Sequence, residues 1–458
     1  MLFNSQAFVL VFLPPVLALY YAARTRTQRQ AVLVAASLAF YGYWNWRFVP
    51  ALVGLTLANW LIARAWSLSG RRAWLGWGVA LNLAVLAVCK YADFLGGALA
   101  GLLGQGWTPL GIILPLGVSF FTFQKISYLI DLRRGAVLNA DRHVYRLLEF
   151  FAFVTFFPAL IAGPLVRHNE IIPQFARDPS GPALWEDLSR GLVLFTIGFF
   201  KKIVLADTAA LVCDPLYAQA ALGPLGAGQA WLAAGSYALQ IMFDFSGYSD
   251  MAIGLGLMFG LRLPLNFNAP YRAASLRDFW RRWHMTLSRF LRDYVYIPLG
   301  GNRAGNAARN VVLTMLLGGL WHGAAWTFVL WGGLHGLGLA VNGVWSRAGR
   351  RMPATAGWVI TLLFVVTAWV VFRAPDFATA ARVWAGMAGQ GGLVPLRIEH
   401  APELALAAVL ALFGPTSQDV ALKFRPRAWL APAAGAALAG LLLFAGGRVP
   451  NEFIYFQF

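Results

Sequence analysis

Charged residues are scarce in this sequence. They make up 12% of its 458 residues, whereas 59% of the residues are hydrophobic. A soluble globular domain carries about 25% charged residues, and lipid is the solvent that tolerates the opposite balance. Because apolar runs long enough to span a bilayer recur along the chain, the composition excludes an ordinary soluble enzyme. It predicts an all-α, polytopic integral membrane protein.

Acidic residues are the rarer charged type. The chain has 19 Asp and Glu against 37 Lys and Arg, which gives a formal net charge of +18. The basic residues gather between apolar runs, as the positive-inside rule expects of cytoplasmic loops, and this pattern argues against nucleic-acid binding. The clusters lie at residues 24–29, 71–72, 133–134, 201–202, 347–351 and 423–427.

Two further absences concern the start of the chain and its cysteines. No basic residue precedes the first apolar run, Ala7–Ala23, and three arginines follow it. A cleaved signal peptide has the opposite order of charge, so we expect a retained first span with a periplasmic N-terminus. The two cysteines, Cys89 and Cys213, show no metal-binding spacing; we expect no metal site and interpret both as small core residues.

No stretch of the chain looks like a soluble domain, and no repeat is evident. Residues 1–458 are therefore expected to form a single membrane-embedded domain with about 11 transmembrane helices. Apolar runs too short to cross alone are interpreted as re-entrant, tilted or interfacial helices. The polar motifs crowd into residues 240–345, approximately, and this region is expected to carry the chemistry.

The first motif, Asp244–Asp250, places two carboxylates, two hydroxyls and a glycine between apolar runs. A charge at the bilayer centre costs about 2.5–3.5 kcal/mol on insertion scales, so these groups should lie in a protein-lined cavity or at an interface. Ser246 and Asp250 are candidate substrate contacts at a sharp turn. Two alternatives remain open: a helix cap, which favours Asp, Ser and Gly, and a structural pairing of Asp250 with an arginine.

The second motif runs from Phe279 to Tyr294 and fits one amphipathic helix. Its apolar residues recur at helical spacing on one side, and Arg282 and Arg289 fall on another. Such a helix is typical of a membrane boundary, with aromatic anchors and basic groups in water. An interfacial anchor without chemistry explains most of the arginines. It explains less well His284, which sits beside the aromatic face.

The third motif, Gly318–Trp326, lies in an apolar hairpin between basic loops at residues 303–309 and 347–351. If both loops are cytoplasmic, the chain goes in and returns between them, and His322 falls near the turn. A neutral imidazole can be buried and can accept a proton from a hydroxyl. A hydrogen-bonded packing role is the alternative for His322 and for the nearby His335.

Together these motifs resemble the membrane-bound O-acyltransferase family, specifically its alginate O-acetyltransferase branch. The matching text covers roughly residues 1–345 and the terminus. It consists of LPLGVSFFTFQ (114–124), FFP (156–158) with AGP (162–164), KK (201–202), AD (206–207), FDFSGYSDMA (243–252), NF (266–267) with PY (270–271), RRWH (281–284), YIPLGGNR (296–303), LWHG (320–323) and FIYFQF (453–458). The resemblance implies the family's fold and acyl transfer in a tunnel or funnel through the membrane domain.

The resemblance also implies roles for the histidines. His322 matches the family's catalytic histidine and is expected to act as general base. His284 matches the second recurrent polar position and is expected to help in the active site or in the structure. His335 is a weaker candidate. The histidines that match no motif are interpreted as loop or interface residues: His143, His168 and His400.

Other substrate contacts follow less directly. Trp321 and Asn302 are expected to orient the thioester or the imidazole. Arg281 and Arg282 are expected to attract donor phosphates, although anchoring at the membrane surface explains these arginines as well. The resemblance implies acetyl-CoA as acyl donor and no bound cofactor.

The acceptor implied by the resemblance is an exopolysaccharide such as alginate, reached from the periplasm by a protein of the bacterial inner membrane. The branch usually works with periplasmic or membrane-anchored acetyltransferase partner proteins. Transfer of D-alanine to teichoic acid and O-acetylation of peptidoglycan or cellulose are alternatives within the family. A secondary transporter is the alternative from another class; it predicts paired broken helices in two halves, and no such duplication is visible.

Overall fold

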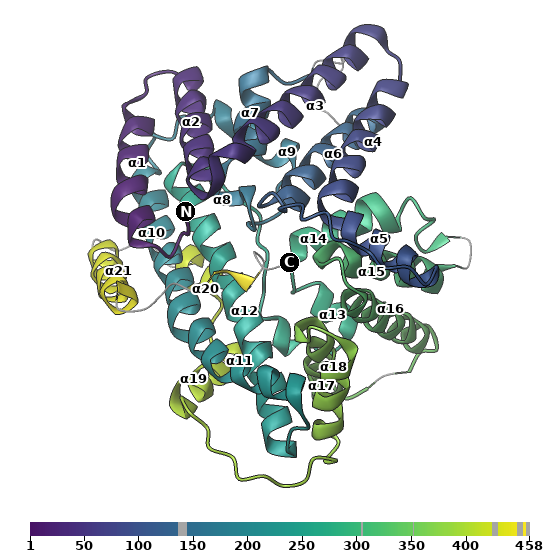
Figure 1. Ribbon diagram of the computed structural model, residues 1–458. Helices are drawn as coiled ribbons and strands as arrows, with labels where there is room; N and C mark the ends of the chain where they lie inside the picture. The colour runs from purple at the N-terminus through teal and green to yellow at the C-terminus, as the bar shows by residue number, and fades with distance from the viewer. Residues whose placement is uncertain (136–143, 304–305, 351, 424–428, 447–451, 455–458) are drawn as a thin grey trace. The chain divides into compact units, whose positions relative to one another are not determined.

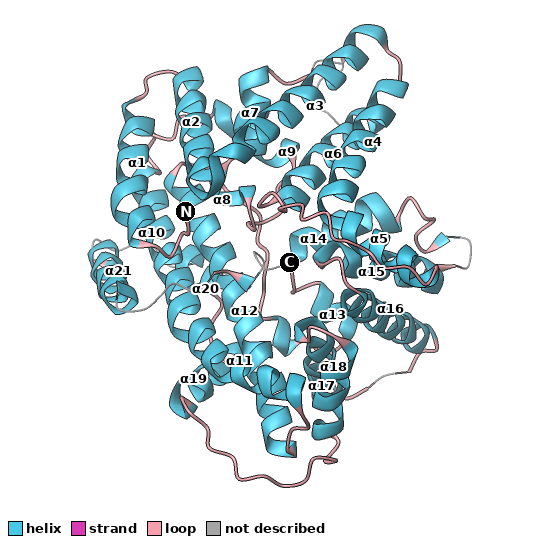
Figure 2. Cartoon of the chain, viewed as in Figure 1, coloured by secondary structure: helices cyan, strands magenta, loops and turns pink. Residues whose placement is uncertain are grey.

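The computed structural model describes residues 1–135, 144–303, 306–350, 352–423, 429–446 and 452–454. Every regular element among these residues is helical, and Figure 2 shows no strand in them. A helix satisfies its backbone hydrogen bonds within one segment, which is what lipid requires of a chain that crosses it. The all-α prediction is confirmed, whereas His143 lies outside the described residues.

The chain divides into two compact units, each assembled from separated segments. Unit 1 comprises Met1–Thr196, Ser249–Pro264 and Ala421–Glu452, and unit 2 comprises Ile197–Tyr248, Leu265–Val420 and Phe453–Phe458. The division falls inside α10 (Leu184–Phe200), α12 (Ala227–Met258) and α20 (Ser417–Lys423), so these helices contribute residues to each unit. The single membrane domain expected over residues 1–458 stays a prediction.

Unit 1 contains the amino-terminal helices, purple to blue in Figure 1. Besides part of α10, of α12 and of α20, its elements are η1 (Ala7–Phe12), α1 (Leu13–Ala22), α2 (Arg26–Asn45), η2 (Trp46–Phe48), α3 (Val49–Ser69), α4 (Ala73–Leu86), η3 (Ala87–Tyr91), α5 (Ala92–Leu102), α6 (Val118–Arg134), α7 (Leu147–Thr155), α8 (Phe157–Leu160), α9 (His168–Ile171), η4 (Ile172–Ala176) and α21 (Leu430–Gly446). Glycine lets α4 and α6 approach closely, because a Cβ on Gly78 would lie 2.6 Å from Leu129 Cδ1.

Unit 2 contains the second and third polar motifs. Besides part of α10, of α12 and of α20, its elements are η5 (Lys201–Ala206), α11 (Asp207–Leu222), η6 (Pro270–Arg272), α13 (Leu276–Trp280), α14 (Met285–Leu291), η7 (Arg292–Tyr296), α15 (Ala307–His322), α16 (Trp326–Arg347), α17 (Ala354–Arg373), α18 (Phe377–Met387) and α19 (Ala401–Leu412). α15 and α16 form a tightly packed antiparallel pair, which lies side by side in Figure 1.

Several helical stretches are long and apolar enough to cross a membrane. Among the described residues these are Arg26–Ser69, Ala73–Leu102, Trp326–Arg347 and Ala354–Arg373, with shorter apolar helices at Ala7–Ala22, Ala401–Leu412 and Leu430–Gly446. In the apolar window of Ala73–Leu102 only 11% is buried by protein, as expected where side chains face lipid. The predicted total of about 11 spans stays a prediction.

The motif Asp244–Asp250 is continuous helix inside α12, which runs for 32 residues. The sharp turn expected there is wrong, and so is the alternative of a helix cap. Gly247 serves packing instead of a turn, because a Cβ at this position would lie 2.7 Å from the carbonyl oxygen of Gly198 in α10. The absence of a side chain therefore lets the two helices meet.

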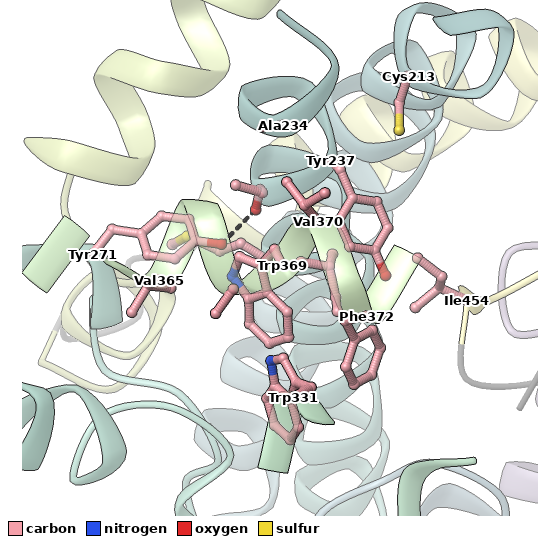
Figure 3. Close-up of a cluster of buried hydrophobic side chains, with 14 of the residues drawn as sticks. Cys213, Ala234, Tyr237, Tyr271, Trp331, Val365, Trp369, Val370, Phe372 and Ile454 are labelled. Atoms are coloured by element: carbon pink, nitrogen blue, oxygen red, sulfur yellow. Dashed lines mark hydrogen bonds between the residues drawn. The ribbon is translucent and has the colours of Figure 1, made fainter. Parts of the chain in front are cut away.

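Aromatic side chains dominate the core of unit 2. Figure 3 shows Trp331, Trp369 and Phe372 packed together, and the two indole rings stack with 5.5 Å between their centroids. Tyr271 donates a hydrogen bond to the Ala238 carbonyl, which is dashed in the figure. Ile454 belongs to the same buried cluster. The third polar motif is thus built around a closely packed aromatic core.

Two histidines outside the motifs have different environments. His168 is fully buried in unit 1, with Nε2 3.2 Å from Asp131 Oδ2 and Nδ1 3.0 Å from Tyr145 Oη. The loop or interface role expected for His168 is wrong, because it is a hydrogen-bonded core residue. His400 lies in an exposed turn before α19, as predicted.

Candidate active site

A helical hairpin positions His322. α15 ends at this histidine and α16 begins at Trp326, so His322 lies at the turn as predicted. Glycines hold the two helices together: a Cβ on Gly332 would overlap the Met315 carbonyl, and one on Gly319 would overlap the Phe328 carbonyl. Only glycine fits where two backbones come this close.

Aromatic rings surround the His322 side chain, which is 3% exposed. Its ring centroid lies 4.9 Å from that of Trp321, 5.2 Å from that of Trp331 and 5.2 Å from that of Phe372, each pair in an edge-to-face arrangement. Burying a charge in apolar surroundings is costly, so this environment favours the neutral imidazole. A neutral ring can accept a proton, as a general base must.

His284 occupies a break between two short helices. α13 ends at Trp280 and α14 begins at Met285, and His284 between them has a left-handed φ of 41°. The single helix expected over Phe279–Tyr294 is therefore wrong. Its apolar side nevertheless becomes buried, at Trp280, Trp283, Leu287, Phe290, Leu291 and Tyr294.

Asn266 fixes the orientation of His284. Its Oδ1 lies 3.0 Å from His284 Nδ1 and accepts hydrogen bonds from Thr286 N at 3.3 Å and from Thr286 Oγ1 at 2.8 Å. Because the Thr286 amide can only donate, this Asn266 atom is the carbonyl oxygen, and His284 Nδ1 must be the donor. The neutral ring then carries its lone pair on Nε2.

His335 lies in the same aromatic environment. Its Nδ1 accepts a 3.2 Å hydrogen bond from Trp280 Nε1, so the neutral ring carries its proton on Nε2. Among the described residues that Nε2 has no hydrogen-bond partner. The His335 ring centroid is 4.7 Å from that of Trp331. The structure thus places His335, a weaker candidate in the sequence than His322 and His284, in the same aromatic surroundings.

Two tryptophans connect the three imidazoles. Trp331 contacts His322 and His335, and Trp321 contacts both His322 and, at 6.0 Å between centroids, His284. We call His284, Trp321, His322, Trp331 and His335 the histidine–tryptophan cluster. All five side chains are buried within unit 2. The arrangement brings three imidazole rings together among buried aromatic side chains, and a placed imidazole is the group that most often accepts a proton from a bound hydroxyl.

Arg281 and Asn302 line a cavity of about 370 Å³ in unit 2, whereas His322 is not among its lining residues. Asn302 accepts a 2.7 Å hydrogen bond from Tyr296 Oη. Arg282 does not line this cavity and pairs with Asp278 at 2.9 Å. The predicted substrate contacts therefore separate: Trp321 belongs to the histidine–tryptophan cluster, and Arg281 and Asn302 belong to the cavity.

Ser246 and Asp250 lie one turn apart on α12. Ser246 is 2% exposed in unit 2, and its Oγ has no hydrogen-bond partner among the described residues. Asp250 is 1% exposed and falls in unit 1, whereas the imidazoles lie in unit 2. Substrate contact by either residue stays a prediction.

Unit 2 also holds a buried ion cluster that the sequence motifs did not predict. Lys202 Nζ lies 2.6 Å from Asp244 Oδ1 and 2.8 Å from Asp207 Oδ1. Asp244 Oδ2 accepts a 2.9 Å hydrogen bond from Ile454 N, and Lys202 lies over the Phe453 ring. The interpretation of Lys202 as part of a basic loop is wrong, since it is 1% exposed. Asp207 and Asp244 lie within the sequence motifs, and these two acidic residues were the signal from which a buried cationic partner could have been predicted.

Comparison with known proteins identifies the family of this chain. The model of the membrane-bound O-acyltransferase family matches residues 117–381, which hold the whole histidine–tryptophan cluster. This chain belongs to that family. It is therefore a multi-pass membrane acyltransferase, and the predicted fold and enzyme class are confirmed.

Individual relatives extend the match beyond the family segment. This O-acyltransferase is 44% identical to the Pseudomonas putida protein named "Probable alginate O-acetylase AlgI", over 84% of this chain and 80% of the relative. It is 40% identical to the Helicobacter pylori "Peptidoglycan O-acetyltransferase", over 86% and 81%. A "Teichoic acid D-alanyltransferase" of Streptococcus thermophilus is 31% identical over 51% of this chain and 57% of the relative.

Proposed function

We propose that this O-acyltransferase transfers acetyl groups from acetyl-CoA to hydroxyl groups of a polysaccharide outside the cytoplasm, with His322 as general base. The observation that carries the proposal is the position of His322 at the turn of the α15–α16 hairpin, inside aromatic surroundings that favour its neutral form. Membership of the O-acyltransferase family supports acyl transfer as the reaction, and the relatives named for O-acetylation support acetyl as the group transferred.

The reaction needs one proton transfer and one displacement. His322 takes the proton of the acceptor hydroxyl while that oxygen attacks the thioester carbonyl. The carbon–sulfur bond breaks, and the imidazolium returns the proton to the departing thiolate. A thioester is already activated, so the base is the main protein group required, and it is worth about 10²–10⁴-fold in rate.

The other imidazoles support this step. Trp321 contacts both His284 and His322, so the hydrogen bonds that hold His284 also limit how the Trp321 ring can move. Trp331 holds His322 from a second side and is itself packed against His335. His284 and His335 therefore act as positioning residues for the base.

The acceptor class is a glycan hydroxyl. The relatives point to two polymers, alginate and peptidoglycan, at similar identities; we favour an alginate-like exopolysaccharide. We propose that the enzyme lies in the inner membrane with its N-terminus in the periplasm. The donor would then reach it from the cytoplasm and the exported acceptor from the periplasm, on opposite sides of the membrane. The described residues form helices and their connections, so we propose that periplasmic or membrane-anchored partner proteins hold the polymer.

Replacing the base tests the proposal directly. With His322→Ala, acetyl transfer from labelled acetyl-CoA to polymer should fall by about 10²–10⁴-fold, because the hydroxyl proton loses its acceptor. The assay uses the full chain in native membranes with its host's polymer, and radiolabel is counted on the purified glycan. His400→Ala, at an exposed turn, is the matched control and should keep the wild-type rate. A His322→Ala protein present at normal levels with undiminished transfer would refute the assignment.

A further inference from the structure

Unit 2 holds a basic cavity apart from the histidine–tryptophan cluster. Its volume of about 370 Å³ falls in the range of small-molecule sites. α13, η7, α15 and α16 supply its walls, and Figure 1 shows the three α-helices grouped together. Four arginines line it: Arg277 in α13, Arg281 directly after α13, Arg292 in η7 and Arg347 in α16. We call this cavity the arginine pocket.

The positive charge of the arginine pocket is largely uncompensated. No acidic residue is among those that line it. Arg292 pairs with Asp293 at 2.6 Å, but Arg277, Arg281 and Arg347 have no ion pair among the described residues. Arg282 and Arg373, outside the pocket, each pair with an aspartate. Guanidinium groups that converge without carboxylates offer paired donors suited to phosphate oxygens.

The N-terminus of α15 adds to the positive electrostatic potential of the arginine pocket. Ala307 and Ala308, its first two residues, line the pocket. No side chain caps this helix at Asn306, and its first turn contains no acidic residue. The first amide N–H groups of a helix have no partner within the helix, and its dipole favours an anion at that end.

The pocket and the base lie at opposite ends of one helix. α15 runs from Ala307 at the pocket to His322, a rise of about 22 Å. α13 makes a second connection, because Arg277 and Arg281 line the pocket while Trp280 between them donates to His335. A ligand anchored in the pocket could therefore reach the base only through a long arm.

We infer that the arginine pocket binds the phosphate groups of the acyl donor and so places its thioester toward His322. The inference rests on the proposed function. The chemistry recognised is a group of clustered phosphates, which a phosphorylated thioester donor and an anionic phospholipid headgroup both carry. The position of the pocket near the opposite end of α15 from the base favours the donor, whose phosphates and acyl group lie at opposite ends of an arm. Acetyl phosphate does not fit, because its phosphate is bonded directly to the acyl group.

Binding measurements on the full chain in detergent test the inference without requiring turnover. Coenzyme A and adenosine 3′,5′-bisphosphate are titrated by calorimetry into wild type and into the double variant Arg281→Gln, Arg347→Gln. Loss of two charged contacts should weaken both ligands by at least about tenfold. The control is Arg71→Gln, Arg72→Gln, which removes the same charge at exposed positions of unit 1 and should bind like wild type.

Two further arms separate the possible failures. His322→Ala should bind coenzyme A like wild type. A variant that loses acetyl transfer but still binds coenzyme A therefore has a defect in the base and not in the arginine pocket. Phosphatidylglycerol in nanodiscs tests the lipid source. Unchanged coenzyme A affinity in the double variant overturns the inference, including the case in which only phosphatidylglycerol binding falls. Absence of coenzyme A binding to wild type overturns it too, while the test of His322 stands independently.

Discussion

His284 holds a backbone conformation that few non-glycine residues adopt. Three hydrogen bonds to one atom, Asn266 Oδ1, involve the side chain of His284 and both donors of Thr286. The backbone carbonyl oxygen of Asn266 also accepts a hydrogen bond from Met285 N. These contacts stabilise the turn and set the tautomer, so the chemistry of His284 depends on a residue that is not itself titratable.

Asn266→Ala should therefore impair the enzyme through His284. It leaves the buried Nδ1–H and the Thr286 donors without their acceptor, which costs about 1–3 kcal/mol for each group left unsatisfied. We expect a lower unfolding temperature in detergent and a lower kcat, with the KM for donor little changed because the arginine pocket is intact. Asn268→Ala, at an exposed position two residues away, is the control. Equal kcat values for the two variants would contradict the positioning role.

At the scale of elements, the α15–α16 hairpin depends on glycines at its interface. Gly332 faces the Met315 carbonyl, where no Cβ fits, whereas a Cβ on the adjacent Gly333 would meet only Leu316 Cδ2 at 3.5 Å. The two positions are neighbours on one helix, yet only one lies at the close approach. Trp331 precedes them and contacts His322, so the fit between these helices also sets the geometry of the base.

Gly332→Ala should push the two helices apart. We expect a loss of about 1–3 kcal/mol in stability from overpacking and a larger loss of activity, because His322 and Trp331 move with their helices. Gly333→Ala is the matched control and should be neutral or stabilising by up to about 1 kcal/mol, since alanine favours a helix interior. Thermal unfolding in detergent and acetyl transfer measure both effects. A Gly332→Ala enzyme as stable and active as Gly333→Ala would exclude this role.

Unit 2 brings together segments that are far apart in the sequence. Lys202, Asp244 and the Phe453–Ile454 segment meet in one buried ion cluster. Tyr248 adds an edge-to-face contact with Phe453 at 4.6 Å. Ile454 then joins the core that contains Phe372, which contacts His322. The Phe453–Ile454 segment is thereby tied to the core around the base.

Asp244→Ala tests this connection. It removes one anion of Lys202 and the acceptor of Ile454 N, and breaking a buried pair costs about 3–5 kcal/mol. We expect a much lower unfolding temperature and faster proteolysis at the carboxyl end. The control is Asp214→Ala, which breaks the 2.7 Å ion pair between Asp214 and Arg373. Because the Asp214 side chain is 53% exposed, this loss should lower the free energy of unfolding by at most about 1 kcal/mol. Similar losses in the two variants would show that the buried cluster is dispensable.

Features that depend on the surrounding solvent and on local residue order could be predicted from the amino-acid sequence. An apolar chain in lipid must satisfy its backbone internally, so composition alone predicts helices. Basic loops on either side of an apolar hairpin place His322 at its turn, because like-charged loops share one side of the membrane. Helical spacing likewise predicted which residues between Trp280 and Tyr294 are buried, since an apolar side avoids water in any helical arrangement.

The contacts between segments far apart in the sequence could not be predicted in this way. Spacing could not show that the chain turns at His284, because the acceptor that stabilises the turn is Asn266, 18 residues earlier. Gly247 suggested a turn, but packing against Gly198 explains it within a continuous helix. Asp244 pairs with Lys202 and with Ile454, 210 residues later. These contacts form between segments far apart along the chain, and no local pattern encodes which segments come together.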